Sequence, residues 1–323
     1  PDAVHYNVYG GSSPAPTALI LTTPGINDTA VAVSDGEFYV TYYFRVTAVD
    51  GGNNESGYSN EVSATPLPTP LQADSLALVA LFNATNGSSW TNNGNWLTGT
   101  LDSWYGVALG EGRVTGISLR SNNLVGTLPS ELGNLTQLNS LDLSDNRLTG
   151  GIPSALGNLT HLVNLDLARN GLTGGFPVEF WNLTSLNSVW LALNNLSGSI
   201  PWEFGNLTNL EVLSLDGNQF TGSIPAQLGN LPILRNLNLS GNQLEGSIPS
   251  ELGNLDSLEV LTLSRNSLTG PIPSSLGGLL RLQSLNLDQN QLTDSIPSAL
   301  GNLTELQSLD LFGNQLTGPI PDA

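Results

Sequence analysis

The last two thirds of the chain repeat one pattern of hydrophobic and polar positions with a fixed period of 24 residues. With x for a variable position, the unit reads LxxLxLxxNxLxGxIPxxLGxLxx, and its copies follow one another without insertion or deletion. Such self-similarity predicts stacked repeats, in which each unit buries its apolar face against the next. Nine copies span residues 114–323, the last of them incomplete, and they begin at Val114, Leu138, Leu162, Leu186, Leu210, Leu234, Leu258, Leu282 and Leu306.

Each copy contains a short alternation of apolar and polar residues, such as the segment from Leu141 to Leu143 around Asp142. This alternation predicts a β-strand with one buried face. Strands from neighbouring copies would then lie side by side in one parallel sheet. The glycine of the LxG segment and the Ile-Pro pair after it are expected to turn the chain toward the opposite, convex side.

An asparagine occupies the ninth position of every copy. An amide held inside an apolar stack has to be fully hydrogen-bonded, and it can bridge the backbones of adjacent turns. We therefore expect a structural ladder made of Asn122, Asn146, Asn170, Asn194, Asn218, Asn242, Asn266, Asn290 and Asn314.

The unit, with its LxGxIPxxLGxL half, resembles the 24-residue plant-type subtype of the leucine-rich-repeat family. This resemblance implies an α/β solenoid, a right-handed superhelix with a parallel sheet on its concave face. One position departs from the pattern, because Asp294 replaces the glycine of its copy.

Residues 71–113 are similar to the N-terminal cap that closes such arrays, since Trp104, Gly106 and Val107 match the WxGV core of the cap. The cysteines that flank this core in plant proteins are replaced by Asp102 and Leu109, which favours a microbial source. Within the cap, we expect a short helix that ends near Phe82 and is capped by Asp74 or Ser75.

Residues 1–66 form a different unit. Alternating residues from Tyr42 to Ala48, a turn at Asp50 and a strand near Tyr58 resemble strands C to G of a fibronectin type III domain, with Tyr42 at the tyrosine-corner position. The counterparts of the first two strands are missing, so a partial β-sandwich is expected. Residues 67–70 read as a stiff, proline-rich linker.

Composition narrows the possible functions. The chain has 323 residues, a net charge of −19, eight basic residues that are all arginine, and no cysteine. Nucleic acid and anionic membranes are therefore poor partners, because both are bound through cationic side chains. No apolar run approaches the roughly 18 residues that span a bilayer. The chain opens without a signal peptide, so a secreted or cell-surface location is inferred from the domain type alone.

Catalytic and metal-binding motifs are not apparent. Only two histidines occur, His5 and His161, and they lie far apart in the sequence. No HExxH, GxSxG or phosphate-binding glycine loop is present. We therefore expect no enzymatic activity, no cofactor and no metal.

On the solvent face of the predicted sheet, the repeat pattern does not fix which residues occur. The central column of this face is mostly small and polar, but Trp190 interrupts it. An aromatic residue framed by charges is a frequent composition of binding hot spots. The candidate ligand-binding patch on the concave face consists of Asp142, Asp145, Asp166, Arg169, Trp190 and Leu193.

The favoured function is an extracellular or cell-surface binding and adhesion scaffold that recognises a protein or a glycan on the concave face. The alternative is a structural subunit that self-assembles into a filament or surface layer through its open N-terminal half-sandwich and uncapped last repeat; truncation of a longer protein explains the same open ends. A third hypothesis, ice binding, rests on a column that Glu245 interrupts: Thr149, Thr173, Ser197, Thr221, Thr269, Thr293 and Thr317.

Overall fold

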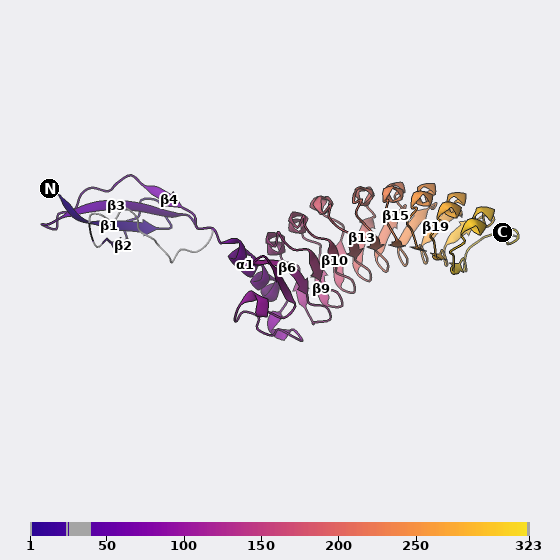
Figure 1. The fold of residues 1–323 in the computed structure, drawn as a ribbon, viewed down its shortest axis with the longest axis horizontal. Helices are drawn as coiled ribbons and strands as arrows, with labels where there is room; N and C mark the ends of the chain where they lie inside the picture. The colour runs from indigo at the N-terminus through magenta and orange to yellow at the C-terminus, as the bar shows by residue number, and fades with distance from the viewer. Residues whose placement is uncertain (1, 24, 26–39, 322–323) are drawn as a thin grey trace. The chain divides into compact units, whose positions relative to one another are not determined.

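The computed structural model describes residues 2–23, 25 and 40–321 (Figure 1). Its contacts divide the chain into two compact units, Pro1–Pro70 and Leu71–Ala323.

The first unit contains a four-stranded antiparallel sheet in the order β2-β1-β3-β4. The strands are β1 (Ala3–Gly11), β2 (Leu19–Thr22), β3 (Tyr42–Asp50) and β4 (Val62–Ala64). The described residues of this unit form this one sheet and no second sheet packed against it. The resemblance to a fibronectin type III sandwich therefore stays a prediction.

One face of this sheet carries a cluster of polar side chains around Glu55. Its carboxylate accepts hydrogen bonds from the hydroxyl groups of Thr47 and Tyr9 and from the amide of Asn7, the last at 2.9 Å. These bonds, with that of Thr47 contributing most, lower the pKa of Glu55 to about 2. The cluster lies at the protein surface, where water competes for the same groups.

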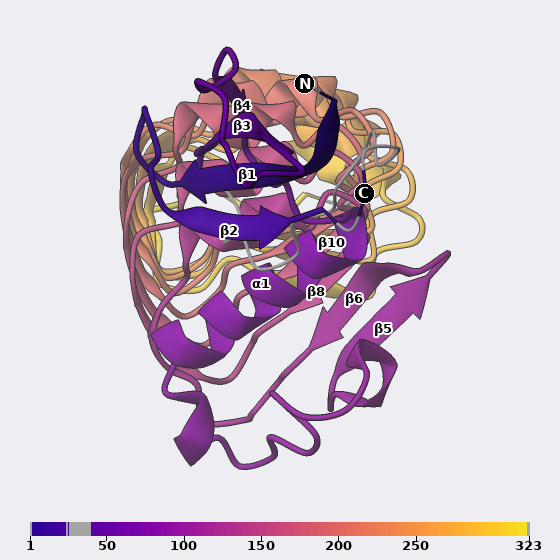
Figure 2. The same cartoon turned by 90° about the vertical axis from the view of Figure 1, so that its left-hand side faces the viewer.

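The second unit begins with the cap, which contains α1 (Pro70–Ala84), η1 (Gly87–Ser89), η2 (Leu101–Ser103) and β5 (Val107–Gly110). The helix lies across the end of the stacked turns (Figure 2). It begins at Pro70, the last residue of the predicted linker, because proline is well suited to the first turn of a helix.

The prediction that Asp74 or Ser75 caps this helix was wrong, since Asp74 lies within the helix and is fully buried. Its carboxylate accepts two hydrogen bonds of 2.8 Å from the guanidinium of Arg113 and a third from the backbone N–H of Val114. This bidentate pair fastens the helix to the first strand of the array. It also raises the pKa of Arg113.

Aromatic rings fill the rest of the cap. Phe82, Trp90, Trp96 and Trp104 pack with ring centroids 4.7 to 5.8 Å apart. Each indole N–H donates a hydrogen bond to a backbone carbonyl of the cap, so burial of the three tryptophans leaves no indole donor unsatisfied. Aromatic packing and the buried Asp74–Arg113 pair thus close the cap of a chain that contains no cysteine.

The concave face of the array is a ten-stranded sheet that runs from β22 to β5. All strands are parallel except β5, which pairs antiparallel with β6 and extends the sheet into the cap. The predicted solenoid with a parallel sheet is confirmed. Its strands are β6 (Arg113–Ser118), β8 (Ser140–Asp142), β10 (Asn164–Asp166), β12 (Ser188–Trp190), β14 (Val212–Ser214), β16 (Asn236–Asn238), β18 (Val260–Thr262), β20 (Ser284–Asn286) and β22 (Ser308–Asp310).

A second parallel sheet of eight strands occupies the segment for which the sequence predicted only a turn. In most copies one leucine, such as Leu148, is buried between exposed or half-buried neighbours, which is the pattern of a short strand. The strands are β7 (Val125–Thr127), β9 (Arg147–Gly150), β11 (Gly171–Gly174), β13 (Asn195–Ser199), β15 (Gln219–Gly222), β17 (Gln243–Gly246), β19 (Ser267–Pro271) and β21 (Gln291–Thr293).

The convex side consists of short 3-10 helices, each of which starts directly after a proline. They form a row along the array in Figure 1. The prolines fix the entry into each helix because their φ angle is already suitable. The helices are η3 (Ser130–Asn134), η4 (Ser154–Asn158), η5 (Val178–Asn182), η6 (Trp202–Asn206), η7 (Ala226–Asn230), η8 (Ser250–Asn254), η9 (Ser274–Gly278) and η10 (Ser298–Asn302).

Candidate functional site

The repeat asparagines hold successive turns together. The side-chain amide of Asn218 donates to the carbonyl of Leu191 in the preceding turn at 2.9 Å, and its oxygen accepts from the N–H of Leu196 at 3.0 Å. The asparagines from residue 146 to residue 314 repeat this arrangement. Asn122, in the first turn, instead exchanges hydrogen bonds with the backbone of Asn92 in the cap. The ladder therefore fixes the register on which the concave face depends.

On the concave face, sheet register places three candidate residues next to one another. Asp142 on β8 lies opposite Asp166 on β10, and Asp166 lies opposite Trp190 on β12. Neighbouring strands are about 4.8 Å apart, so these side chains form one continuous row. Trp190 is half-buried, whereas Leu193 in the same turn keeps 44% of its surface exposed.

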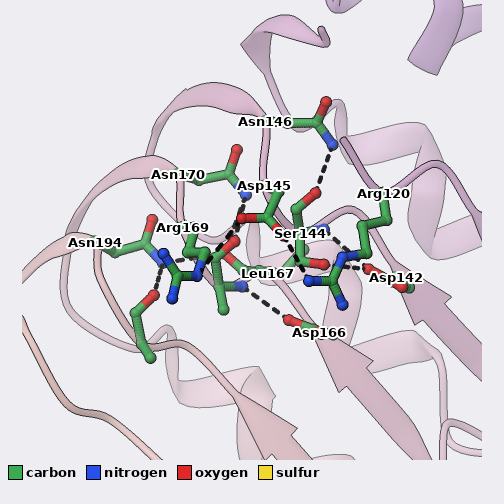
Figure 3. A network of polar contacts seen from close by, with 12 residues as sticks. Arg120, Asp142, Ser144, Asp145, Asn146, Asp166, Leu167, Arg169, Asn170 and Asn194 are labelled. Atoms are coloured by element: carbon green, nitrogen blue, oxygen red, sulfur yellow. Dashed lines mark hydrogen bonds and ion pairs between the residues drawn. The ribbon is translucent and has the colours of Figure 1, made fainter. Parts of the chain in front are cut away.

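The remaining candidates join an ion-pair network at the edge of this row. The carboxylate of Asp145 lies between two guanidinium groups, as Figure 3 shows, 2.8 Å from Nη2 of Arg120 and 3.5 Å from Nε of Arg169. Sequence reasoning missed Arg120. The signal in the sequence was a basic residue, one of only eight in the chain, two positions after Ser118 of the central column. This position lies in the turn before Asp142 and Asp145. We call the seven residues the concave patch: Arg120, Asp142, Asp145, Asp166, Arg169, Trp190 and Leu193.

The two carboxylates in the middle of the patch are not fully compensated. Asp142 accepts hydrogen bonds from the backbone and hydroxyl of Ser144, and Asp166 accepts one from the backbone of Ala168 at 3.0 Å. Partial burial raises the pKa of Asp166, and the negative charge of Asp142 beside it adds to this shift. A cation that approached both carboxylates would remove that repulsion.

The backbone supplies a second observation at the same turns. Asp145, Arg169 and Leu193 each have a φ of +55°, in the left-handed region that favours glycine. The next two turns place Gly217 and Gly241 at this position. A side chain there costs on the order of 1 kcal/mol, and because Ser121, Arg265 and Gln289 also carry one at this position, the patch shares this penalty with other turns of the array.

The described residues also limit other chemistry. Among them, no three histidine, cysteine, aspartate or glutamate side chains gather in an arrangement that could hold a metal ion. None of the helices in the described part of the chain is long and apolar enough to cross a membrane.

The second sheet and the last turn of the array bear on the remaining hypotheses. The strands β7 to β21 present the threonine column on an exposed face, interrupted by the exposed Glu245. At the last turn, Leu309 and Phe312 are 45% and 75% exposed. Self-assembly through this edge stays a prediction.

Models of known families match the array directly. The leucine-rich-repeat model matches residues 113–135, 137–159, 161–183 and 185–207, and the leucine-rich-repeat-region model matches residues 218–318. Together these matches cover more than half of the chain. The chain is a leucine-rich-repeat protein. Comparison with curated proteins returned no match.

Solved leucine-rich-repeat structures are similar to it. The ectodomain of the Arabidopsis thaliana membrane receptor kinase GASSHO1/SCHENGEN3, in complex with CASPARIAN STRIP INTEGRITY FACTOR 2, is 42% identical over 77% of this chain and 30% of its own, with a TM-score of 0.74. The ectodomain of the Arabidopsis receptor kinase HAESA, in complex with a peptide hormone ligand, is 37% identical over 78% of this chain and 43% of its own, with a TM-score of 0.71. A plant ice-binding protein is 29% identical over 77% of this chain and 89% of its own, with a TM-score of 0.66.

The present chain therefore spans less than half of the length of either receptor ectodomain. The microbial source expected from the cysteine-free cap stays a prediction.

Proposed function

We propose that this leucine-rich-repeat protein is an extracellular recognition module that binds a peptide segment along its concave face, at the concave patch. The observation that carries the proposal is the placement of Asp142, Asp166 and Trp190 in one row across three paired strands. A protein ligand is favoured over a glycan because two similar structures are receptor ectodomains in complex with CASPARIAN STRIP INTEGRITY FACTOR 2 and with a peptide hormone.

The chemistry of the patch selects the kind of peptide. Asp142 and Asp166 lie side by side, and partial burial, together with the charge of Asp142, raises the pKa of Asp166 and so disfavours its charged form. A ligand arginine or lysine placed between them gains charge-assisted hydrogen bonds and relieves their repulsion. Trp190 and Leu193 then offer apolar surface to the next ligand residue. The expected ligand is a peptide with a basic residue next to an apolar one.

A short probe tests this directly. The peptide acetyl-Arg-Arg-Leu-Leu-amide is titrated into the full chain by calorimetry at low ionic strength, and acetyl-Glu-Glu-Leu-Leu-amide serves as the charge-reversed control. We expect binding of the first peptide alone. Asp166→Asn and Trp190→Ala should each weaken it about tenfold, equivalent to about 1.4 kcal/mol.

Two matched control variants distinguish a loss of binding at the concave patch from a general effect of removing a negative charge or an exposed tryptophan. Asp310→Asn makes the same change in the same column, on β22, and Trp202→Ala removes a tryptophan that is 53% exposed on the convex side. Both should bind the probe like the native chain. No binding of the arginine peptide, or equal losses from the patch and control variants, would contradict the proposal.

A second candidate, ice binding, is favoured by two observations. The exposed column of threonine and serine on β9 to β21 repeats once per turn on a hydrogen-bonded sheet, and the similar plant ice-binding protein is covered over 89% of its length. Glu245 places a charge in that column. Ice-recrystallisation assays test the idea, with Glu245→Thr expected to increase inhibition; no inhibition by either form would remove this candidate.

A further inference from the structure

One position on the convex side departs from the repeat in a way that bears on the concave patch. Where most turns carry glycine in the fourth position of the 3-10 helix, η5 carries Trp181. These glycines are needed for close packing of neighbouring turns. A Cβ added at Gly157 would lie 2.2 Å from the carbonyl oxygen of Glu179, and one at Gly205 would lie 2.3 Å from that of Gln227.

A tryptophan cannot occupy that space, so η5 and η6 are held apart. In Figure 1 the coil of residues 178–182 and the coil of residues 202–206 stand farther apart than the neighbouring coils of the row. Aromatic rings fill the space between them. Trp181 packs against Phe204 of the next turn with ring centroids 5.1 Å apart, and Phe176 packs against Phe204 at 5.0 Å.

The residues around Trp181 are also larger than those at the same positions of other turns. Phe176 stands where most other turns have isoleucine, and Phe180 and Phe204 stand where most have leucine. Phe180 and Phe204 are fully buried, and their rings also contact Trp181 or Phe176. The aromatic wedge, defined as Phe176, Phe180, Trp181 and Phe204, is therefore a packed part of the core.

The concave side does not open at the same place. Asn164 to Asp166 on β10 remain paired in register with Ser188 to Trp190 on β12, so the strand spacing there is that of an ordinary sheet. When the outer side of a stack is spread and its inner side is held, the stack must bend. The line of this bend runs between β10 and β12, and therefore between Asp166 and Trp190.

We propose that the aromatic wedge bends the array across the concave patch, so that Trp181 is a positioning residue that tilts Trp190 and Leu193 toward Asp166 and Arg169. This inference rests on the proposed peptide-binding function. Trp181 lies on the convex side and does not contact a ligand on the concave face. It would influence peptide binding only through the orientation of the patch residues.

The bend itself is measured in the full chain, whose lack of cysteine permits clean labelling. Spin labels on Ser154→Cys and Ala226→Cys span η5 and η6, and labels on Ala226→Cys and Ser298→Cys span the same number of turns without the wedge. The wedge is then replaced by residues of the other turns in a variant with Trp181→Gly, Phe176→Ile, Phe180→Leu and Phe204→Leu. Because glycine and leucine already pack at these positions elsewhere, this variant should fold.

We expect the first label distance to shorten by roughly 3 to 4 Å, one packed layer of carbon atoms, and the second to stay unchanged. Affinity for acetyl-Arg-Arg-Leu-Leu-amide should fall about fivefold in the same variant, although no patch residue is altered. Trp181→Phe, which retains a smaller wedge, should give intermediate values of both quantities.

The outcomes are distinguishable. An unchanged first distance would overturn the wedge, and a shortened distance with unchanged affinity would overturn the positioning role; either result leaves the proposed function standing if the native chain binds the peptide through Asp166. If the native chain does not bind the peptide, both proposals are overturned.

Discussion

The cap and ladder of one unit and the Glu55 cluster of the other use polar side chains in opposite ways. In the unit Leu71–Ala323, Asp74 and Asn218 are buried, 0% and 7% exposed, and they bind backbone groups of neighbouring segments. In the unit Pro1–Pro70, Glu55 binds other side chains at the surface. Water can replace the second kind of bond but cannot reach the first. Similar functional groups should therefore differ greatly in what they contribute to stability.

The largest effect is expected at the buried ion pair of the cap. Asp74→Ala removes one partner and leaves the guanidinium of Arg113 and the N–H of Val114 without their acceptor. Breaking a fully buried pair costs about 3 to 5 kcal/mol, and a loss of about 3 kcal/mol is expected here because the Arg113 side chain is 21% exposed. Chemical denaturation measures the loss, and Asp256→Ala, at an exposed position, should remain within about 0.5 kcal/mol of the native chain. Equal losses in the two variants would show that Asp74 does not hold the cap.

The asparagine ladder comes next. Asn218→Ala should cost about 1 to 3 kcal/mol, because backbone groups of two turns lose their hydrogen bonds in the interior. Asn314→Ala should cost less, since the last turn is more exposed and solvent can satisfy the freed groups. Asn195→Ala, on an exposed strand position, serves as the control. Thermal melts that rank the control with Asn218→Ala would contradict the assignment of the ladder.

A smaller effect of opposite sign is expected in the concave patch. The pKa of Asp166 is raised in the folded chain, so its ionisation opposes folding as the pH rises through that raised value. Asp166→Asn should then raise the melting temperature at neutral pH by about 1 to 2 °C while it weakens binding of the arginine peptide. Asp310→Asn should change neither quantity. A destabilised Asp166→Asn variant would mean that the charge supports the fold.

The smallest effect is expected at Glu55, and it depends on pH. Its pKa is lowered to about 2, so its contribution to stability is present above the ordinary carboxyl value of 4.5 and is lost as the pH falls toward 2. Glu55→Gln should reduce this acid sensitivity of the first unit, to which Asp50 with its lowered pKa also contributes, and should leave the array unaffected. Amide NMR spectra recorded between these pH values test the prediction, which fails if both forms lose their β1 and β3 signals together.

Prediction from the sequence worked where the determining interactions repeat with the period of the chain. The concave strands and the positions of Asp142, Asp166 and Trp190 in one row follow from counting residues. The second sheet was missed because glycine and proline signals concealed strands as short as Val125–Thr127. The role of Asp74 was missed because Arg113 lies 39 residues away, outside any repeat. Arg120 and the aromatic wedge were missed for a related reason, since their effect depends on adjacent turns rather than on local sequence.

The asparagine ladder also makes the 24-residue turn an interchangeable part. Beyond the wedge, the turns from Leu234 to Leu282 offer their neighbours the same amide donor, the same acceptor and the same leucine layer, so the bonds at these junctions do not depend on which turns meet there. Removal of residues 234–257 would bring Asn266 into the place of Asn242 and restore every ladder bond. Array length can therefore change by whole turns, at positions beyond the wedge, while the surface that carries Asp166 and Trp190 keeps its shape.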